Sequence, residues 1–131
     1  MSDPALTDLI AVDTGVWLEG LLFGGSAEEL VRMAVAEQIR LVTCEALILE
    51  LETILRRRLA FSEAAAQAVV EFVRDCAEVR PDPGPAAGAL DRRALLLNVA
   101  ERSGADAIFT TDRSRLHRLG RSSSVPVVSI V

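Results

Sequence analysis

Apolar and polar positions change along the chain in a pattern that favours strands and helices in alternation. The apolar run "LIAV" at 9–12 has the length and the branched side chains of a buried strand, and the polar triplet "DTG" follows it directly. Apolar residues then recur at helical spacing, at Trp17, Leu18, Leu21 and Leu22. The glycine pair at 24–25 is typical of a helix end. We therefore predict a strand over Leu9–Asp13 and a helix after it.

The next fifty residues predict two more helices separated by a strand. Ser26 with Glu29 has the spacing of a capping box, so a helix is expected to begin at Ser26. Its apolar face would contain Leu30, Val31, Ala34 and Val35. A strand is expected over Leu41–Thr43, and a helix from about Glu45 to Leu59 follows it. The buried stripe of that helix would contain Leu47, Ile48, Leu51, Ile54 and Leu55.

The rest of the chain continues the alternation. A helix is expected to begin at Ser62, with an apolar face of Ala65, Ala68, Val69, Phe72, Val73 and Cys76. The Pro- and Gly-rich segment 80–89 predicts a loop that is too short to separate two domains. A helix over 91–103 leads to a strand over Ala107–Thr110 and a short helix near 114–119. The last strand, Val125–Val131, contains Pro126, which suits the edge of a sheet.

Strands that alternate with helices predict an α/β fold with a mostly parallel central sheet flanked by helices. The chain has 131 residues, half of them hydrophobic, so we expect a single domain over 1–131 with one sizeable core. No apolar run approaches the length that spans a bilayer, and the start "MSDPALTD" lacks the features of a signal peptide. We therefore expect a cytoplasmic protein that does not associate with membranes.

Composition excludes several classes of site. Two cysteines, Cys44 and Cys76, predict buried thiols rather than a disulfide framework, and one histidine is too few for a structural zinc site. All 14 basic residues are arginines. The absence of lysine excludes a Walker A phosphate loop and a Schiff-base mechanism. The net charge of −5 is concentrated in the first half of the chain, whereas residues 86–131 are net positive.

Two carboxylates follow predicted strands of the same parallel sheet. Asp13 follows the first strand, and Asp112 follows the strand over 107–110. Because ligands bind beyond the carboxyl ends of parallel strands, both side chains should reach one edge of the sheet. Carboxylates that converge repel one another unless they are protonated or share a cation, and Mg²⁺ takes oxygen ligands. The spacing is equally compatible with two separate residues that cap the helices after them.

Three segments resemble motifs of one protein family. The segment "LIAVDTGVWLEGLLFGG" (9–25) is similar to the opening of a PIN domain, especially in the toxin-like subfamily of toxin–antitoxin systems. The segment "LVTCEALILELETILRRR" (41–58) resembles that subfamily's strand and helix with an acidic residue before a leucine. "GADAIFTTDRSRL" (104–116) resembles its last acidic motif. The resemblance covers nearly the whole chain and implies the Rossmann-like PIN fold.

The resemblance places the metal-binding, catalytic acids of the family on Asp13, Glu50 and Asp112. It implies a Mg²⁺- or Mn²⁺-dependent ribonuclease that hydrolyses RNA, and many such proteins are toxins neutralised by an antitoxin protein. The resemblance also implies that Thr14 and Thr110 lie next to these acids and help to position them. Helix geometry does not separate Glu50 from Glu52, because both flank the apolar stripe at about 100° from its centre. Only the motif chooses Glu50.

Two positions depart from the family pattern. Gly15 stands where the family usually has Asn or Ser, so a polar side chain beside the acids is lost. The family's third acid opens the penultimate helix, at the position that Arg93 occupies here. The nearest acid, Asp91, lies two residues earlier, about 200° around an ideal helix. Either Asp91 swings into the site as a further metal ligand, or Arg93 points in and the site is inactive.

These observations leave two hypotheses of different classes. The first is a PIN-type ribonuclease, the toxin of a toxin–antitoxin pair, and the alternative is a catalytically degenerate PIN fold that binds RNA or protein. Arg113 and Arg115 follow Asp112 directly, so they are candidates for contacts with the RNA backbone. An apolar face in the 62–78 region would suit a homodimer. A haloacid-dehalogenase phosphatase is excluded, because it needs a second Asp where Gly15 stands.

Overall fold

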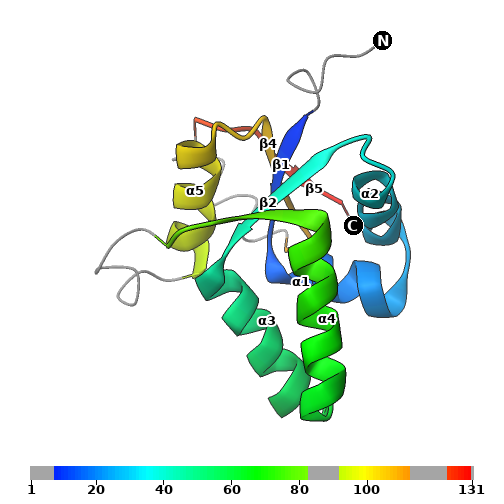
Figure 1. Ribbon diagram of the computed structural model, residues 1–131. Helices are drawn as coiled ribbons and strands as arrows, with labels where there is room; N and C mark the ends of the chain where they lie inside the picture. The colour runs from blue at the N-terminus through cyan, green and yellow to red at the C-terminus, as the bar shows by residue number, and fades with distance from the viewer. Residues whose placement is uncertain (1–7, 83–91, 113–123, 131) are drawn as a thin grey trace.

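The computed structural model describes residues 8–82, 92–112 and 124–130, the side chains at 92 and 93 excepted. Its centre is a five-stranded sheet in which all strands run parallel. The strands are β1 (Leu9–Val12), β2 (Arg40–Cys44), β3 (Ala77–Arg80), β4 (Ala107–Thr110) and β5 (Val127–Ser129). They lie in the order β3-β2-β1-β4-β5 (Figure 1). The order reverses at β1, so β1 and β4 flank the point at which open α/β sheets bind ligands.

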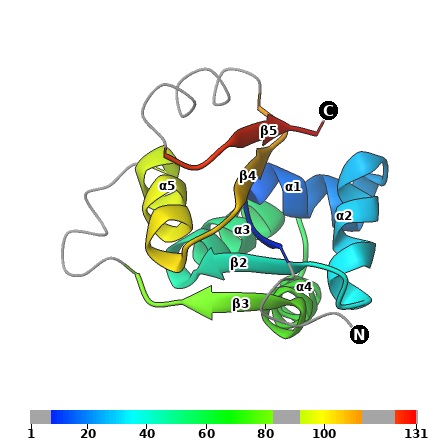
Figure 2. The ribbon, with the colours of Figure 1, turned by 90° about the horizontal axis from the view of Figure 1, so that it is seen from above.

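Helices occupy the connections between the strands, as the alternating pattern predicts. They are α1 (Thr14–Leu18), α2 (Ser26–Val35), α3 (Glu45–Arg57), α4 (Glu63–Cys76) and α5 (Arg92–Ser103). A π-helical turn, η2 (Glu19–Phe23), extends α1. α5 covers one side of the sheet and α2 the other (Figures 1 and 2). The predicted α/β class with a parallel central sheet is confirmed.

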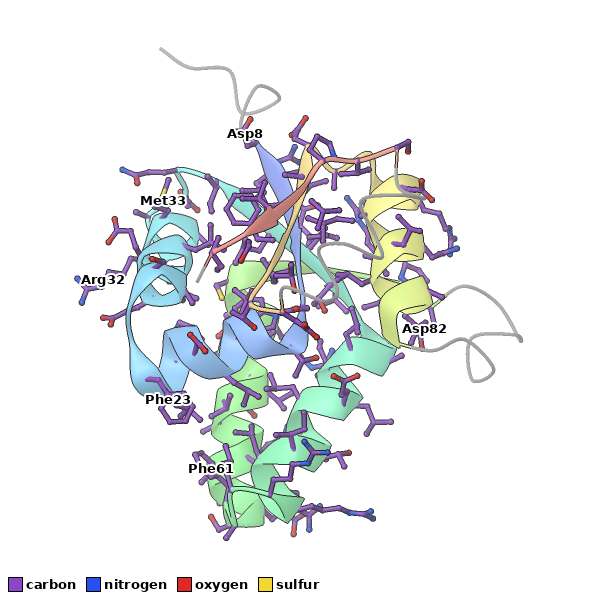
Figure 3. The ribbon with its side chains drawn as sticks, turned by 180° about the vertical axis from the view of Figure 1, so that it is seen from behind. Asp8, Phe23, Arg32, Met33, Phe61 and Asp82 are labelled. Atoms are coloured by element: carbon purple, nitrogen blue, oxygen red, sulfur yellow. The ribbon has the colours of Figure 1, made fainter. Side chains whose placement is uncertain are left out.

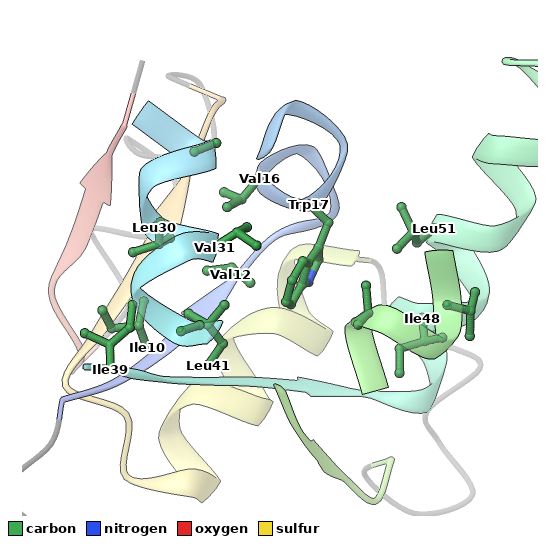
Figure 4. Packing of buried hydrophobic residues seen from close by; sticks show 14 of the residues in the cluster. Ile10, Val12, Val16, Trp17, Leu30, Val31, Ile39, Leu41, Ile48 and Leu51 are labelled. Carbon is green, nitrogen blue, oxygen red and sulfur yellow. The ribbon is translucent and has the colours of Figure 1, made fainter. Parts of the chain in front are cut away.

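Alternate residues of β1 face two separate apolar clusters. Ile10 and Val12 belong to the larger cluster, which α1, α2, α3 and α4 complete (Figure 4). Leu9 and Ala11 belong to the second cluster, which α5 completes. Because successive side chains of a strand point to opposite faces, Asp13 continues the alternation on the side of α5. The pattern that buries β1 on both faces therefore also sets the direction of the first carboxylate.

The helices α3 and α4 form an antiparallel pair that extends beyond the carboxyl edge of the sheet, and we call this pair the α3–α4 arm (Figure 1). α3 starts directly after β2 at that edge, and α4 leads back to β3. Apolar residues on the facing sides of the two helices continue the larger cluster into the arm: Ile48, Leu51, Leu55, Ala66, Val70 and Val73. The arm is therefore part of the same core as the sheet.

The four predicted strands, β1, β2, β4 and β5, are confirmed within about two residues at each end, whereas β3 was not predicted. β3 follows α4 without a break and, among the described strands, pairs only with β2. Its sequence, Ala-Glu-Val-Arg, has one branched apolar residue, and three of its four residues are only half-buried. Such an edge strand has no apolar run to reveal it. β5 is the other edge, as Pro126 indicates.

Two predictions about α2 were wrong. The capping box is not formed, because Gly25 is the N-cap, Ser26 is already helical, and no side chain makes a cap hydrogen bond. Gly25 has a φ of 80°, a backbone conformation that suits glycine and that turns the chain into the helix without a side-chain cap. Val35, expected on the buried face, is the last residue of α2 and is 57% exposed.

The buried face of α4 was also predicted in the wrong place. Ser62 does cap the helix, accepting a hydrogen bond from Ala65 N–H at 3.1 Å. The fully buried residues, however, are Ala66, Val70 and Val73, whereas Phe72 is 38% exposed. Alanines at 64–66 and 68 give an apolar pattern that several faces of a helix satisfy equally. Packing against α3, rather than the pattern, selects the face.

No helix in the described ranges 8–82, 92–112 and 124–130 combines the length and apolar character needed to cross a membrane. The predicted short helix near 114–119 and most of the predicted 80–89 loop lie outside those ranges.

Candidate functional site at the carboxyl edge of the sheet

The pairing of β1 with β4 brings Asp13 opposite Thr110. Val12 is the register partner of Phe109, and the backbone N–H of Asp13 donates to the Phe109 carbonyl at 3.3 Å. Both strands, β1 and β4, end at the same edge of the sheet, where α1 begins at Thr14. The convergence predicted from the carboxyl ends of parallel strands is therefore present for the first strand and the strand over 107–110.

The Asp13 carboxylate is only 2% exposed and is held by donors from two elements. Its Oδ1 accepts a hydrogen bond from the Val16 backbone N–H of α1 at 3.0 Å. Its Oδ2 accepts a hydrogen bond from the Thr110 hydroxyl of β4. The first bond is the N-cap expected if Asp13 simply caps the helix that follows it. The second is not part of a cap, and it ties the carboxylate to the neighbouring strand, as a buried charge requires.

Thr110 connects the two predicted acids of the edge. Its side chain is fully buried, and its Oγ1 donates to Asp13 while it accepts from the Asp112 backbone N–H at 3.0 Å. A hydroxyl can do both because it carries one hydrogen and two lone pairs. Asp112 itself is exposed. The structure therefore places one buried acid, Asp13, and one exposed acid, Asp112, at the same edge. The Thr110 hydroxyl bonds to the carboxylate of the first and to the backbone of the second.

Thr14 adds a second hydroxyl to this edge. It is the first residue of α1, directly after Asp13, and it is 5% exposed. Its Oγ1 has no hydrogen-bond partner among the described residues. A buried hydroxyl without a protein partner fits a site that takes water or another oxygen ligand.

Glu50 lies on the α3–α4 arm, on a different side of α3 from Glu52. Glu50 is half-buried in a depression of about 420 Å³ that contains Leu49, Thr53 and Arg57. Glu52 instead lines a depression toward α4, with Arg74. The two acids that the helical pattern treats as equivalent thus face different neighbours. Only the tertiary structure makes this distinction.

The described residues supply oxygen donors from two carboxylates rather than a closed cage of acids. Within 8–82, 92–112 and 124–130, no group of three or more Asp, Glu, His or Cys side chains is placed to hold a metal ion. Asp13 and Asp112 with the hydroxyls beside them nonetheless match the chemistry of Mg²⁺. That ion is usually bound by one or two carboxylates and keeps several waters. The donor set therefore fits a hard divalent cation.

The remaining predicted site residues lie outside the described part of the chain. These are Asp91, Arg113 and Arg115, together with the side chain of Arg93. The backbone of α5 nevertheless begins at the carboxyl edge, since α5 ends just before β4 starts at the opposite edge. α5 also covers the face of the sheet toward which Asp13 is directed. This placement of α5 is consistent with Asp91 as a metal ligand and equally with Arg93 pointing into an inactive site.

Two further residues at this edge were missed by sequence reasoning. Asp82 follows β3, and its Oδ1 accepts from the Ala46 backbone N–H at 2.9 Å, which caps α3 in place of Cys44 (Figure 3). Burial, with a contribution from Asp82, raises the pKa of the Cys44 thiol to about 11, so this thiol is neutral at pH 7. Thr111 is the other missed residue, and its side chain packs against Gly15. The missing side chain at Gly15 was the signal in the sequence that another residue could pack there.

Comparisons with known proteins agree with this geometry. The family model described as the PIN domain matches residues 10–114 of the chain. Among solved structures, the crystal structure of PAE2754 from Pyrobaculum aerophilum is similar, with a TM-score of 0.62 and 20% sequence identity. The match covers 96% of this chain and 92% of that chain. At that identity the likeness supports the fold alone. No curated protein matches the chain.

Proposed function

Because the chain belongs to the PIN domain family, generally a metal-dependent nuclease fold, we propose that it is a ribonuclease that uses Mg²⁺ or Mn²⁺ to hydrolyse RNA phosphodiesters. The observation that carries the proposal is the Thr110 hydroxyl, which donates to the Asp13 carboxylate and accepts from the backbone N–H of Asp112, the second acid of this edge. A helix cap alone would not need the bond from Thr110 to Asp13. The bond does hold one carboxylate oxygen in a fixed direction at the ligand-binding edge.

Asp13 and Asp112 would hold the metal ion, with Glu50 and Asp91 as further ligands. When bound, such an ion lowers the pKa of a coordinated water and offsets the charge that develops on the phosphate. Thr110 and the Val16 N–H hold the buried Asp13 carboxylate in one orientation. Asp112, exposed at the end of the same network, is the carboxylate that a large substrate reaches first.

Arginines would bring the RNA backbone to this edge. We propose that Arg113 and Arg115, which follow Asp112 in the chain, contact phosphates through their guanidinium groups. The net positive charge of residues 86–131, in a chain that is otherwise acidic, supports this location. We also propose a toxin role with an antitoxin partner, supported by the resemblance of residues 9–25 to the toxin-like subfamily.

Metal binding can be tested separately from activity. A cation that binds the folded state raises the melting temperature, so Mn²⁺ should stabilise the wild type. Asp13→Asn should remove that rise. Asp106→Asn is the matched control, because Asp106 also accepts a backbone hydrogen bond, from Leu9 N–H at 2.8 Å, but at the opposite edge. An equal rise in all three proteins would remove Asp13 from the metal site.

Cleavage of RNA is the second test. Wild type and Asp106→Asn should cleave a labelled RNA with Mn²⁺, whereas Asp13→Asn and Asp112→Asn should not. Chelation with EDTA should stop the reaction in every active protein. Absence of cleavage by the wild type under all metal conditions would contradict the enzymatic assignment.

The alternative is a binding module without catalysis, and one observation favours it. The described residues contain no group of three acids placed for a metal ion. In that case the wild type would bind RNA without cleaving it, and Arg93→Asp would gain Mn²⁺-dependent cleavage. Loss of wild-type cleavage in Asp91→Asn would instead show that Asp91 completes the site.

A further inference from the structure

Gly15, in the first turn of α1, packs against Thr111, the residue that follows β4. A Cβ atom added at Gly15 would overlap the Thr111 hydroxyl oxygen and would lie 3.7 Å from Thr111 Cβ. The same Cβ would lie 3.4 Å from Asp13 Oδ1. The hydroxyl of Thr111 therefore fills the space that a side chain at position 15 would take, beside the Asp13 carboxylate.

We propose that Thr111 is a positioning residue of the site at the carboxyl edge. Its hydroxyl, delivered from the end of β4, replaces the polar side chain that α1 lacks at Gly15. Because a hydroxyl both donates and accepts, it can orient a water or a phosphate oxygen next to Asp13. This inference rests on the proposed metal-dependent function of the same site and adds a residue to it.

The neighbours of Thr111 in the chain show why this hydroxyl is suited to a ligand. Thr110 is fully buried, and its hydroxyl is engaged with both Asp13 and the Asp112 backbone. Thr111 is only half-buried, so its side chain borders the solvent from which a ligand arrives. The two consecutive threonines therefore have different roles in the proposed site. Thr110 orients the Asp13 carboxylate, and Thr111 faces the ligand.

A side chain at position 15 and the Thr111 hydroxyl in its present orientation cannot occupy the same space. The atom that a Cβ at position 15 would meet is the terminal oxygen of a side chain that can rotate about χ1. Gly15→Ala should therefore turn the Thr111 hydroxyl away from Asp13 rather than unfold the protein. Thr111→Val removes the same hydroxyl with little change in shape. The two variants act on different elements but should have the same effect on the site.

The experiment compares the apparent affinity for Mn²⁺, measured by thermal shift, and the affinity for a 2′-O-methyl RNA that cannot be cleaved through its 2′-hydroxyl. Thr111→Val and Gly15→Ala should each weaken Mn²⁺ binding about tenfold or more, the usual effect of losing a group that orients metal ligands. Melting temperatures in EDTA should stay close to that of the wild type. Thr111→Ser should keep wild-type affinity.

The exchange variant Gly15→Ser with Thr111→Gly provides the sharpest control. It moves the hydroxyl from the residue after β4 to α1 without changing the number of hydroxyls, so it should recover most of the Mn²⁺ affinity that Thr111→Gly alone loses. A merely structural role for Thr111 would change the melting temperature in EDTA but leave Mn²⁺ affinity unchanged.

The outcomes separate this proposal from the nuclease assignment. Wild-type Mn²⁺ affinity and cleavage in Thr111→Val would overturn the role of Thr111 and leave the nuclease assignment intact. Mn²⁺ binding that depends on Thr111, in a wild type that cleaves no RNA, would support the role and overturn only the enzymatic assignment. A wild type that neither binds Mn²⁺ nor cleaves RNA would overturn both.

Discussion

The carboxyl edge of the sheet and the α3–α4 arm each hold a carboxylate with strong hydrogen bonds, but in opposite ways. At the edge, Asp13 is buried and accepts from a backbone N–H and from the Thr110 hydroxyl. On the arm, Glu45 is half-exposed and accepts two bonds from the Arg74 guanidinium, at 2.6 and 2.8 Å. The Asp13 carboxylate is thus the more deeply buried of the two.

We expect burial, rather than the charge of the partner, to decide how much each contact contributes to stability. A buried carboxylate that loses a donor keeps its desolvation cost, whereas an exposed one regains water. Loss of a donor should therefore cost more stability at the edge than on the arm. We expect the free energy of unfolding to follow burial in both regions.

The largest effect is expected inside the arm itself. Leu51 is 1% exposed in the larger cluster, and Leu49 on the same helix is 63% exposed. Leu51→Ala should lower the free energy of unfolding by roughly 2–5 kcal/mol, through lost burial and a residual cavity. Leu49→Ala should change it by less than about 0.5 kcal/mol. Urea denaturation measures both, and similar losses would contradict burial as the deciding factor.

The next effect concerns the hydroxyl between the two acids. Thr110→Val keeps the shape but removes the donor to Asp13 and the acceptor of the Asp112 N–H. We expect a loss of about 2–3 kcal/mol, because a buried charge loses a hydrogen bond. Thr53→Val is the matched control, since the exposed Thr53 hydroxyl bonds only within α3, to the Leu49 carbonyl at 2.8 Å. Its effect should stay within about 0.5 kcal/mol.

Alkaline pH tests a third buried group, the Cys44 thiol at the end of β2. Burial raises its pKa to about 11, so above pH 9 the unfolded chain loses this proton before the folded chain does. Stability should therefore fall by about 1–2 kcal/mol between pH 9 and pH 11. The chain has no lysine or tyrosine, which leaves the thiols as the side chains that titrate there.

Cys76 provides the comparison for Cys44 in the same experiment. Its pKa is also raised to about 11, mainly by burial, although its side chain is only half-buried at the end of α4. Cys44→Ala and Cys76→Ala should each flatten part of the alkaline loss, and the double variant should remove it. A Cys44→Ala variant that loses as much stability as the wild type across this range would contradict the prediction.

Sequence reasoning predicted the parts of the fold that a continuous apolar pattern encodes. β1 and β2 are almost entirely buried, and β4 alternates buried with half-buried residues within an apolar run. Their positions and the order of the helices between them could therefore be predicted. β3 could not, because an edge strand buries too little to need an apolar run. The face of α4 could not either, since its alanines fit several faces and α3 makes the choice.

The candidate site was predictable only as far as strand ends determine it. Asp13 and Asp112 follow from the rule that parallel strands end at one edge. The bond from Thr110 to Asp13 depends on the register of β1 and β4, which no local pattern reveals. The packing of Thr111 on Gly15 likewise joins residues almost a hundred positions apart. From the sequence Gly15 is only a lost polar side chain, because Thr111, which packs against it, follows a strand distant in the chain.

The smallest effect is expected for the ion pair of the arm, although Arg74 donates two short hydrogen bonds to Glu45. A double-mutant cycle with Glu45→Gln and Arg74→Gln should give a coupling of roughly 0.5 kcal/mol that falls in 1 M salt, because both side chains are about half exposed. The hydrogen bond from Arg74 lowers the pKa of Glu45, so the coupling is present above the pKa of the unfolded glutamate. It should disappear as the pH falls through the lower pKa of the folded state. A coupling as large as the loss in Thr110→Val would break the comparison, because partner charge would then outweigh burial.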